Sequence, residues 1–130
     1  MWVAQSDYTA DLRIGPEILK GVADSYRRLR NTMRFMLGSL SDYDVSDETV
    51  SNEMTELERW VLHRLFELDE KVQQGYDSYD FQGVFQAIFT FATVDLSSFY
   101  FDIRKDVLYC DGDTIERRSA RTVLNLLFIV

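Results

Sequence analysis

Apolar side chains recur every three or four positions over several long segments of the chain, and this is the period of an amphipathic α-helix. The first segment opens at Gly15-Pro16-Glu17, where a proline and an acidic residue suit the first turn of a helix. We expect this helix to reach about Leu40 and to bury one apolar stripe, formed by Ile18, Val22, Tyr26, Leu29, Met33, Met36 and Leu40. The polar run from Ser41 to Ser51 predicts a loop.

Two more helices follow the loop. The second is expected from about Glu53 to Gln74, with Gly75 placed to end it. The third is expected from about Asp80, whose side chain can cap it, to Tyr100. Its residues are apolar over more than half of the helix circumference, so we expect it at the centre of a bundle.

The segment from Asp102 to Asp111 mixes charged and apolar residues, and we interpret it as a structured connector. Asp113-Thr114-Ile115-Glu116 has the spacing of a capping box and opens a fourth helix, which runs to the end of the chain. The pattern therefore predicts an all-α helical bundle of about four helices. The chain ends on an apolar run, so we expect it to be part of a longer protein that can self-associate through Leu124, Leu127 and Phe128.

Composition narrows the class of protein further. A chain of 130 residues with 46% hydrophobic residues suits one domain with its own core. A single cysteine excludes an internal disulfide and a cysteine-rich zinc site within this chain. The first residues lack the pattern of a secretory signal, and charges interrupt the apolar stretches well short of a membrane span. We therefore expect a cytoplasmic protein with no membrane partner.

The net charge of −8 argues against nucleic-acid binding only as an average. Residues 12–37 carry six Lys and Arg against two acidic residues, a net charge of +4, whereas residues 39–80 carry twelve acidic residues against three basic ones. Within the first helix, basic and amide side chains recur at helical spacing. We expect Arg27, Arg30, Asn31 and Arg34 to face RNA, with Arg28 and Lys20 as weaker candidates. The alternative is a solvated helix face with no ligand.

The chain offers few residues for catalysis. His63 is the only histidine, and no nucleophile-elbow motif accompanies it, so we interpret it as a surface or interface residue. Cys110 has no second cysteine and is expected to be a packed thiol. We therefore predict no catalytic residue.

Metal and base-stacking sites receive little support from the pattern. The acidic loop residues Asp42, Asp44, Asp47 and Glu48 lack the central glycine and the terminal glutamate of a calcium-binding loop, so we predict no metal site. Six aromatic residues have the helical spacing typical of core residues, although they also offer a stacking platform; they are Tyr76, Tyr79, Phe81, Phe85, Phe89 and Phe91.

Three segments resemble isoleucyl-tRNA synthetases. Residues 25–40, SYRRLRNTMRFMLGSL, resemble the helix that opens the anticodon-binding domain of this class I family. Residues 2–8, WVAQSDY, are similar to the junction that leaves the catalytic domain, and residues 99–110, FYFDIRKDVLYC, to another recurrent stretch. Val45 departs from the family pattern, which usually has a proline there. The likeness extends over nearly the whole chain.

This resemblance implies an anticodon-binding helical domain over residues 1–130, with residues 1–11 as the junction and residues 12–130 as the bundle. It implies binding of the anticodon stem-loop of an isoleucine-accepting tRNA, within an enzyme that charges this tRNA using ATP and Mg. The nucleotide-binding signatures of class I enzymes are absent from these residues, so we expect the fragment alone to be inactive and to hold no cofactor. Any zinc module lies elsewhere, and the catalytic domain is a partner in the same polypeptide.

Two alternatives remain open from the sequence. One is a helical protein-interaction module without RNA binding. The other is the equivalent domain of a valyl- or leucyl-tRNA synthetase.

Overall fold

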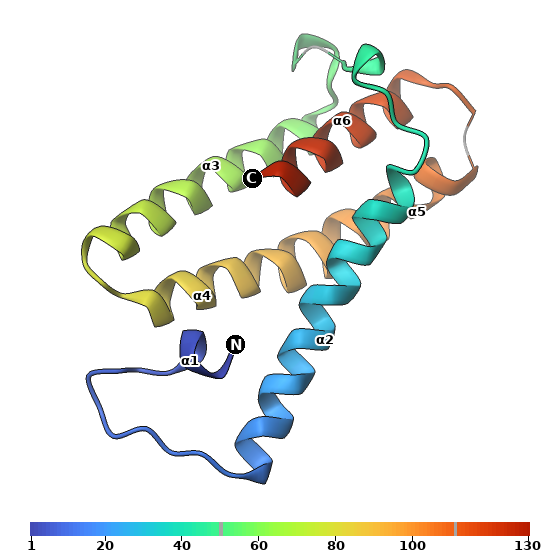
Figure 1. The fold of residues 1–130 in the computed structure, drawn as a ribbon. Helices are drawn as coiled ribbons and strands as arrows, with labels where there is room; N and C mark the ends of the chain where they lie inside the picture. Colours follow the sequence, from blue (N-terminus) through green and yellow to red (C-terminus); the bar gives the residue numbers. More distant parts are fainter. Residues whose placement is uncertain (50, 111) are drawn as a thin grey trace.

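The computed structural model describes residues 1–49, 51–110 and 112–130, and this part of the chain contains helices and no strand. The main helices are α1 (Trp2–Gln5), α2 (Pro16–Ser39), α3 (Glu56–Asp77), α4 (Phe81–Thr90), α5 (Phe101–Cys110) and α6 (Ile115–Ile129). Two short 3-10 turns, η1 (Val45–Asp47) and η2 (Ser51–Glu53), lie between α2 and α3, and the π-helix η3 (Phe91–Tyr100) joins α4 to α5. Figure 1 shows α2 crossing the long α4–α5 helix, and α3 and α6 lie side by side and pack on that helix. The predicted all-α class is confirmed.

The helix starts follow from residues that satisfy the first free N–H groups. Pro16 is the first residue of α2, and the Asp80 side chain accepts a hydrogen bond of 3.0 Å from the Gly83 N–H at the start of α4. At the start of α6, however, the cap is Thr114, which accepts from the Arg117 N–H. The predicted capping box is therefore wrong, because Glu116 then lies one position too early to complete it.

The third predicted helix is longer than its pattern indicated. Residues of the predicted connector form α5, so α4, η3 and α5 make one continuous helix from Phe81 to Cys110; Asp111 lies outside the described residues, as does residue 50 of the predicted loop. The connector interpretation is wrong because no helix-breaking residue interrupts this stretch. A π-helical segment instead shifts the register between its two halves.

By length and composition alone, this continuous helix is the one candidate membrane span in the described part of the chain, with a mean hydropathy of 1.3. This criterion tolerates a few charges, and Asp95 does interrupt the uncharged stretch that begins at Phe81. The core helix of a soluble protein meets the same criterion. Here the helix packs against α2, α3 and α6, and it carries Asp95 and Arg104, which form ion pairs inside the bundle.

The core lies where α3, η3, α5 and α6 meet. Its fully buried apolar residues include Val61, Tyr100, Val123 and Leu124. The predicted stripe of α2 contributes less than expected, because Ile18, Tyr26 and Met33 are exposed, and of the seven stripe residues only Met36 is buried. Leu124 and Leu127 are buried in their own chain, so of the three residues expected to mediate self-association only Phe128 is exposed.

Gly75 does not end its helix, contrary to the prediction. α3 continues to Asp77, and the chain turns through Tyr79, which has a positive φ of 59°. A Cβ atom at Gly75 would collide with the Cγ2 methyl of Val84 on α4. The glycine is therefore needed for the close approach of α3 to α4.

Replacing Gly75 by Ala is expected to lower the free energy of unfolding by about 1–3 kcal/mol, because the β-branched Val84 has little freedom to move away. Urea unfolding followed by circular dichroism measures the change. Gly21→Ala in α2 is the matched control, since a Cβ atom there meets nothing within 4 Å. We expect that control to be neutral or stabilising by about 0.5–1 kcal/mol. Equal effects of the two substitutions would contradict the packing argument.

A buried network of polar side chains ties α3 to α5. The Glu58 carboxylate is completely buried and accepts hydrogen bonds from Arg104 Nε (2.6 Å) and Nη2 (2.9 Å). The Tyr100 hydroxyl donates to the same carboxylate at 3.3 Å, and Thr55 binds both Glu58 and Arg104. Burial, together with the negative charge of Glu58, raises the pKa of Tyr100, so its hydroxyl stays protonated and remains a donor.

Candidate nucleic-acid interface

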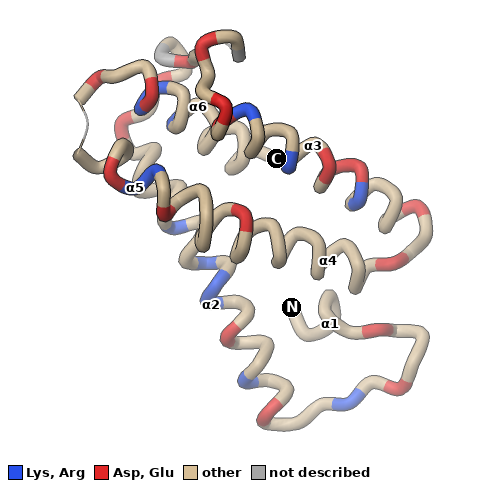
Figure 2. The backbone as a smooth tube through the Cα atoms, turned by 180° about the vertical axis from the view of Figure 1, so that it is seen from behind, with Lys and Arg blue, Asp and Glu red and all other residues tan. Residues whose placement is uncertain are grey.

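The basic residues predicted to bind RNA lie along the solvent-facing side of α2. All six predicted side chains are exposed: Lys20, Arg27, Arg28, Arg30, Asn31 and Arg34. At about 100° per residue, Arg27 and Arg34 lie almost opposite the buried Thr32 and Met36. Figure 2 shows these Lys and Arg positions recurring along α2. We call these six residues the α2 basic stripe.

Most of the cations in this stripe have no acidic partner. Arg27 forms an ion pair with Asp24 (2.6 Å), but both side chains are more than half exposed, so the pair is weak and easily exchanged. Lys20, Arg28, Arg30 and Arg34 form no ion pair within the described part of the chain. The stripe therefore presents guanidinium groups that are free to bind phosphate oxygens.

The rear of α2 is fixed, which holds the stripe in place. The Thr32 hydroxyl lies 2.8 Å from the Ser97 hydroxyl, and Phe35 stacks on Phe101 with ring centroids 4.4 Å apart. These contacts attach α2 to η3 and α5. A rigid helix presents its cations at fixed spacing, about 21 Å from Lys20 to Arg34 at 1.5 Å per residue. Such a line suits a polyanionic backbone better than a small anion.

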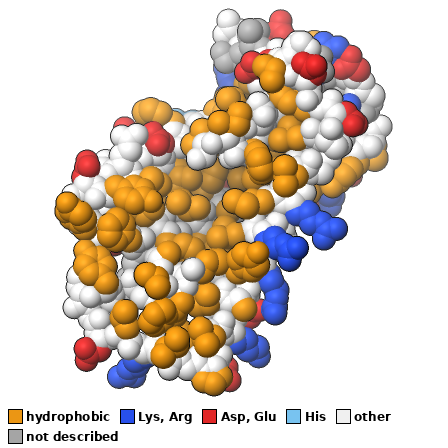
Figure 3. Space-filling model, viewed as in Figure 1, with side chains coloured by type: hydrophobic (Ala, Val, Ile, Leu, Met, Phe, Trp, Pro, Cys, Tyr) orange, Lys and Arg blue, Asp and Glu red, His pale blue; other side chains and the backbone are white. Residues whose placement is uncertain are grey.

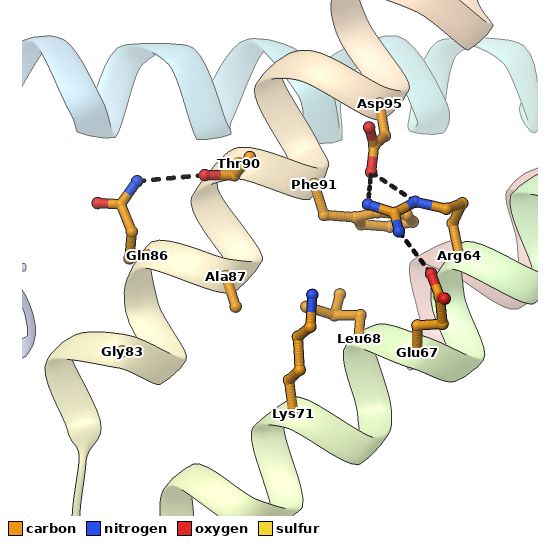
Figure 4. Close-up of a pocket in the computed structure, with 10 residues that line it drawn as sticks. All are labelled: Arg64, Glu67, Leu68, Lys71, Gly83, Gln86, Ala87, Thr90, Phe91 and Asp95. Atoms are coloured by element: carbon orange, nitrogen blue, oxygen red, sulfur yellow. Dashed lines mark hydrogen bonds and ion pairs between the residues drawn. The ribbon is translucent and has the colours of Figure 1, made fainter.

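A polar cleft between α3 and α4 was not predicted from the sequence. Figure 4 shows Arg64 of α3 reaching Asp95 of η3, at 3.0 Å from Nη2, and also binding Glu67. The cleft has a volume of about 350 Å³ and also contains Lys71. The hydrogen bonds that Arg64 donates to Asp95 and Glu67 raise the pKa of Arg64, so this cation stays charged. The cleft holds two basic and two acidic side chains, so its net charge is zero. The Arg64–Asp95 ion pair attaches η3 to α3.

One feature of the sequence indicates the ion pair between Arg64 and Asp95. Arg64 and Glu67 have the i,i+3 spacing of a helical ion pair, but Asp95 is 31 residues away from Arg64 and no local pattern connects them. Asp95 is the only acidic residue between Phe81 and Phe101. A single carboxylate in an otherwise apolar helix indicates that the carboxylate has a basic partner inside the protein.

The other candidate residues show no catalytic arrangement. His63 is exposed and lies 3.6 Å from Glu67, on the surface as expected. Cys110 is exposed, so the expectation of a packed thiol is wrong. Asp44 caps η1, and the Ser46 N–H holds the pKa of this carboxyl below its ordinary value. No group of three or more potential metal ligands occurs among the residues that the structure describes.

The aromatic residues divide between the core and the surface. Phe91 is buried, as expected for a core residue, but Tyr76, Tyr79 and Phe81 are exposed at the α3–α4 turn. Tyr8 joins them, with its ring 6.1 Å from Phe81 and its hydroxyl bound to the Tyr79 carbonyl. The core interpretation is therefore wrong for Tyr76, Tyr79 and Phe81, because they lie around the turn, outside the packed core of the bundle.

The sequence matches a family model and several curated relatives. Residues 58–130 match the model described as the anticodon-binding domain of tRNA ligase. The isoleucine–tRNA ligase of Ruegeria pomeroyi is 74% identical over 129 residues, and the match covers 98% of this chain and 13% of the relative. The isoleucine–tRNA ligases of Agrobacterium fabrum and Bacillus mycoides are each 48% identical to this chain. The matches cover 98% and 95% of the chain and 13% and 14% of the two relatives.

These matches agree with the architecture and with the resemblance in the sequence. The family model covers α3 to α6, with the buried Glu58–Arg104 network inside its range, and α2 precedes it. The alignments with the curated relatives extend over nearly the whole chain, which spans 13–14% of their length. The chain therefore belongs to the anticodon-binding domain family of tRNA ligases.

Proposed function

We propose that this chain binds the anticodon stem-loop of a tRNA through the α2 basic stripe. The observation that carries the proposal is the row of exposed arginines on α2, of which only Arg27 has an acidic partner, Asp24, in the described structure. Phosphate contacts by such side chains supply most of the affinity of a nucleic-acid interface. The family membership supports RNA as the ligand.

We further propose that the chain is part of an isoleucine–tRNA ligase, since the relatives above carry that name. This favours an isoleucine-accepting tRNA over the valyl and leucyl alternatives. In the whole protein, ATP and Mg would act at a catalytic domain of the same polypeptide, and this domain would hold the anticodon arm. We expect the 130-residue chain alone to be inactive, to hold no cofactor and to be cytoplasmic.

Titration of the chain with a labelled isoleucine anticodon stem-loop tests the proposal. We expect saturable binding whose logarithmic affinity falls linearly with the logarithm of the salt concentration, because phosphate contacts release counterions. A stem-loop with the same stem and a different anticodon measures the contribution of the bases. Absence of binding at low salt, or binding with no salt dependence, would contradict the proposed interface.

A further inference from the structure

Tyr26 is an exposed aromatic side chain on α2, next to the α2 basic stripe. It is 53% exposed, and within the described part of the chain its ring meets no other aromatic ring and its hydroxyl forms no hydrogen bond. The other aromatic residue of α2, Phe35, is partly buried and stacks on Phe101. Tyr26 therefore presents a ring that the described structure leaves half exposed to solvent.

The charges around Tyr26 favour a negatively charged ligand. At about 100° per residue, Arg30 and Arg27 lie about 40° and 100° around the helix from Tyr26, and Arg30 is only about 6 Å along the axis. The two acidic residues of α2, Glu17 and Asp24, lie about 160–180° away from Tyr26. Figure 3 shows Lys and Arg side chains along one edge of the molecule, with hydrophobic side chains beside them.

Other exposed aromatic rings lie in acidic surroundings. Tyr76 and Tyr79, at the α3–α4 turn, are each followed directly by an aspartate, Asp77 and Asp80 respectively. Carboxylates repel a phosphate backbone, so these two tyrosines are poor contacts for RNA. The ring of Tyr26 is instead bordered by free guanidinium groups.

Tyr26 is also separate from the apolar surfaces next to the two ends of the sequence. It lines neither the hydrophobic groove that contains Phe128 and Val130 nor the one that contains Met1 and Val3. Its exposure therefore does not depend on these terminal residues.

We propose that Tyr26 stacks on an unpaired base of the anticodon loop, while Arg30, one turn further along α2, binds a phosphate of the same strand. This rests on the RNA binding proposed above and adds a contact with a base. Single-stranded loops of RNA are recognised in this way, with unstacked bases on aromatic rings and the backbone on nearby cations. An uncharged ring adds affinity without releasing counterions, so its contribution is separable from that of the stripe.

Substitutions at Tyr26 test the proposal on the 130-residue chain, with a fluorescein-labelled isoleucine anticodon stem-loop as the probe. Tyr26→Ala is expected to weaken binding roughly 5- to 100-fold and to leave the salt slope unchanged. Tyr26→Leu should weaken it nearly as much, because leucine is apolar but has no aromatic face. Tyr26→Trp should stay within about twofold of the unchanged chain, since its ring also stacks.

Leu37→Ala is the matched control. Leu37 is 54% exposed and lies within about 20° of Tyr26 around the helix, but it has no ring to stack, so we expect less than about a twofold change. Circular dichroism checks that each variant remains helical. Stem-loops with the fluorescent base 2-aminopurine at single loop positions report the stacking itself: at one position the bound fluorescence should be lower with Tyr26 than with Tyr26→Ala.

The longer protein tests whether another part of the polypeptide covers Tyr26. The chain spans 13–14% of the length of its relatives, so the same variant is also measured in the whole protein, with the complete tRNA as the probe. Tyr26→Ala should weaken tRNA binding there by a similar factor. Unchanged binding in the whole protein would assign Tyr26 to a contact between domains and overturn the proposal.

Three further results would overturn it. They are equal stem-loop affinity of the unchanged chain and Tyr26→Ala, full retention of affinity by Tyr26→Leu, and a fall of the salt slope in Tyr26→Ala. Salt-dependent binding that ignores Tyr26 would reject the stacking contact and leave the stripe in place. Absence of any binding by the unchanged chain would reject both.

Discussion

Replacing Glu58 by Ala is expected to lower the free energy of unfolding by about 3–5 kcal/mol, because it removes the buried counterion of Arg104 and leaves only the more exposed Glu116 beside it. The Arg104 side chain is only 11% exposed, so water does not replace the lost carboxylate. Tyr100 would lose its acceptor at the same time. A small domain is stable by about 5–15 kcal/mol, so this single change removes a large part of the total. Urea unfolding at pH 7 measures it.

Glu116 provides the matched control for this prediction. Its carboxylate lies 3.7 Å from the Arg104 Nη1, but its side chain is 55% exposed. Glu116→Ala should therefore cost less than about 1 kcal/mol, as expected of a partly solvated ion pair. The double variant Glu58→Leu with Arg104→Met should be more stable than Glu58→Ala, since it removes both buried charges together. Comparable losses for Glu58→Ala and Glu116→Ala would contradict the role of burial.

The buried Glu58–Arg104 pair could not be predicted from the sequence pattern. Periodicity places charged residues on the outer face of a helix, yet Glu58 is the most deeply buried carboxylate of the described chain. Its partner Arg104 is 46 residues away, in a segment that the pattern assigned to a connector. The mixture of charged and apolar residues led us to interpret that segment as a structured connector, whereas one of its charges, Arg104, neutralises Glu58 inside the bundle.

Local chemistry predicted the starts of α2 and α4, whereas the stop at Gly75 and the capping box at Asp113 were wrong. Gly15 and Pro16 start α2 as predicted, and Asp80 caps α4. The apolar stripe of α2 was interpreted less well, because a shared face shows which residues lie together and does not show whether another element covers them. Tyr26 and Met33 lie on that face and are exposed.

The candidate interface was predictable in position because charge is visible in the sequence. All six predicted residues are exposed on α2, as a binding stripe requires, and their contact with RNA stays a prediction. The absence of acidic partners for most of them depends on tertiary packing. The sequence is acidic on both sides of α2, yet among the described residues only Asp24, within the same helix, pairs with the stripe.

Replacing Arg27, Arg30 and Arg34 together by Ala is expected to weaken stem-loop binding on the order of 10³-fold or more, because each lost charge-assisted contact costs about 1.5 kcal/mol or more. The slope of logarithmic affinity against logarithmic salt should fall by roughly 2–3, since each phosphate contact contributes about 0.7–0.9. Fluorescence anisotropy at several salt concentrations measures both quantities. The side chains are exposed, so the variant should keep its helical content.

Arg59→Ala separates a local interface from general attraction between the protein and RNA. Arg59 is an exposed arginine on the acidic helix α3, with no ion pair in the described part of the chain. Its loss lowers the net charge by one without touching the stripe. We expect less than about a twofold change in affinity and an unchanged salt slope. If Arg59→Ala weakens binding as much as each stripe arginine alone, the attraction is general, and the assignment of the RNA contacts to α2 is wrong.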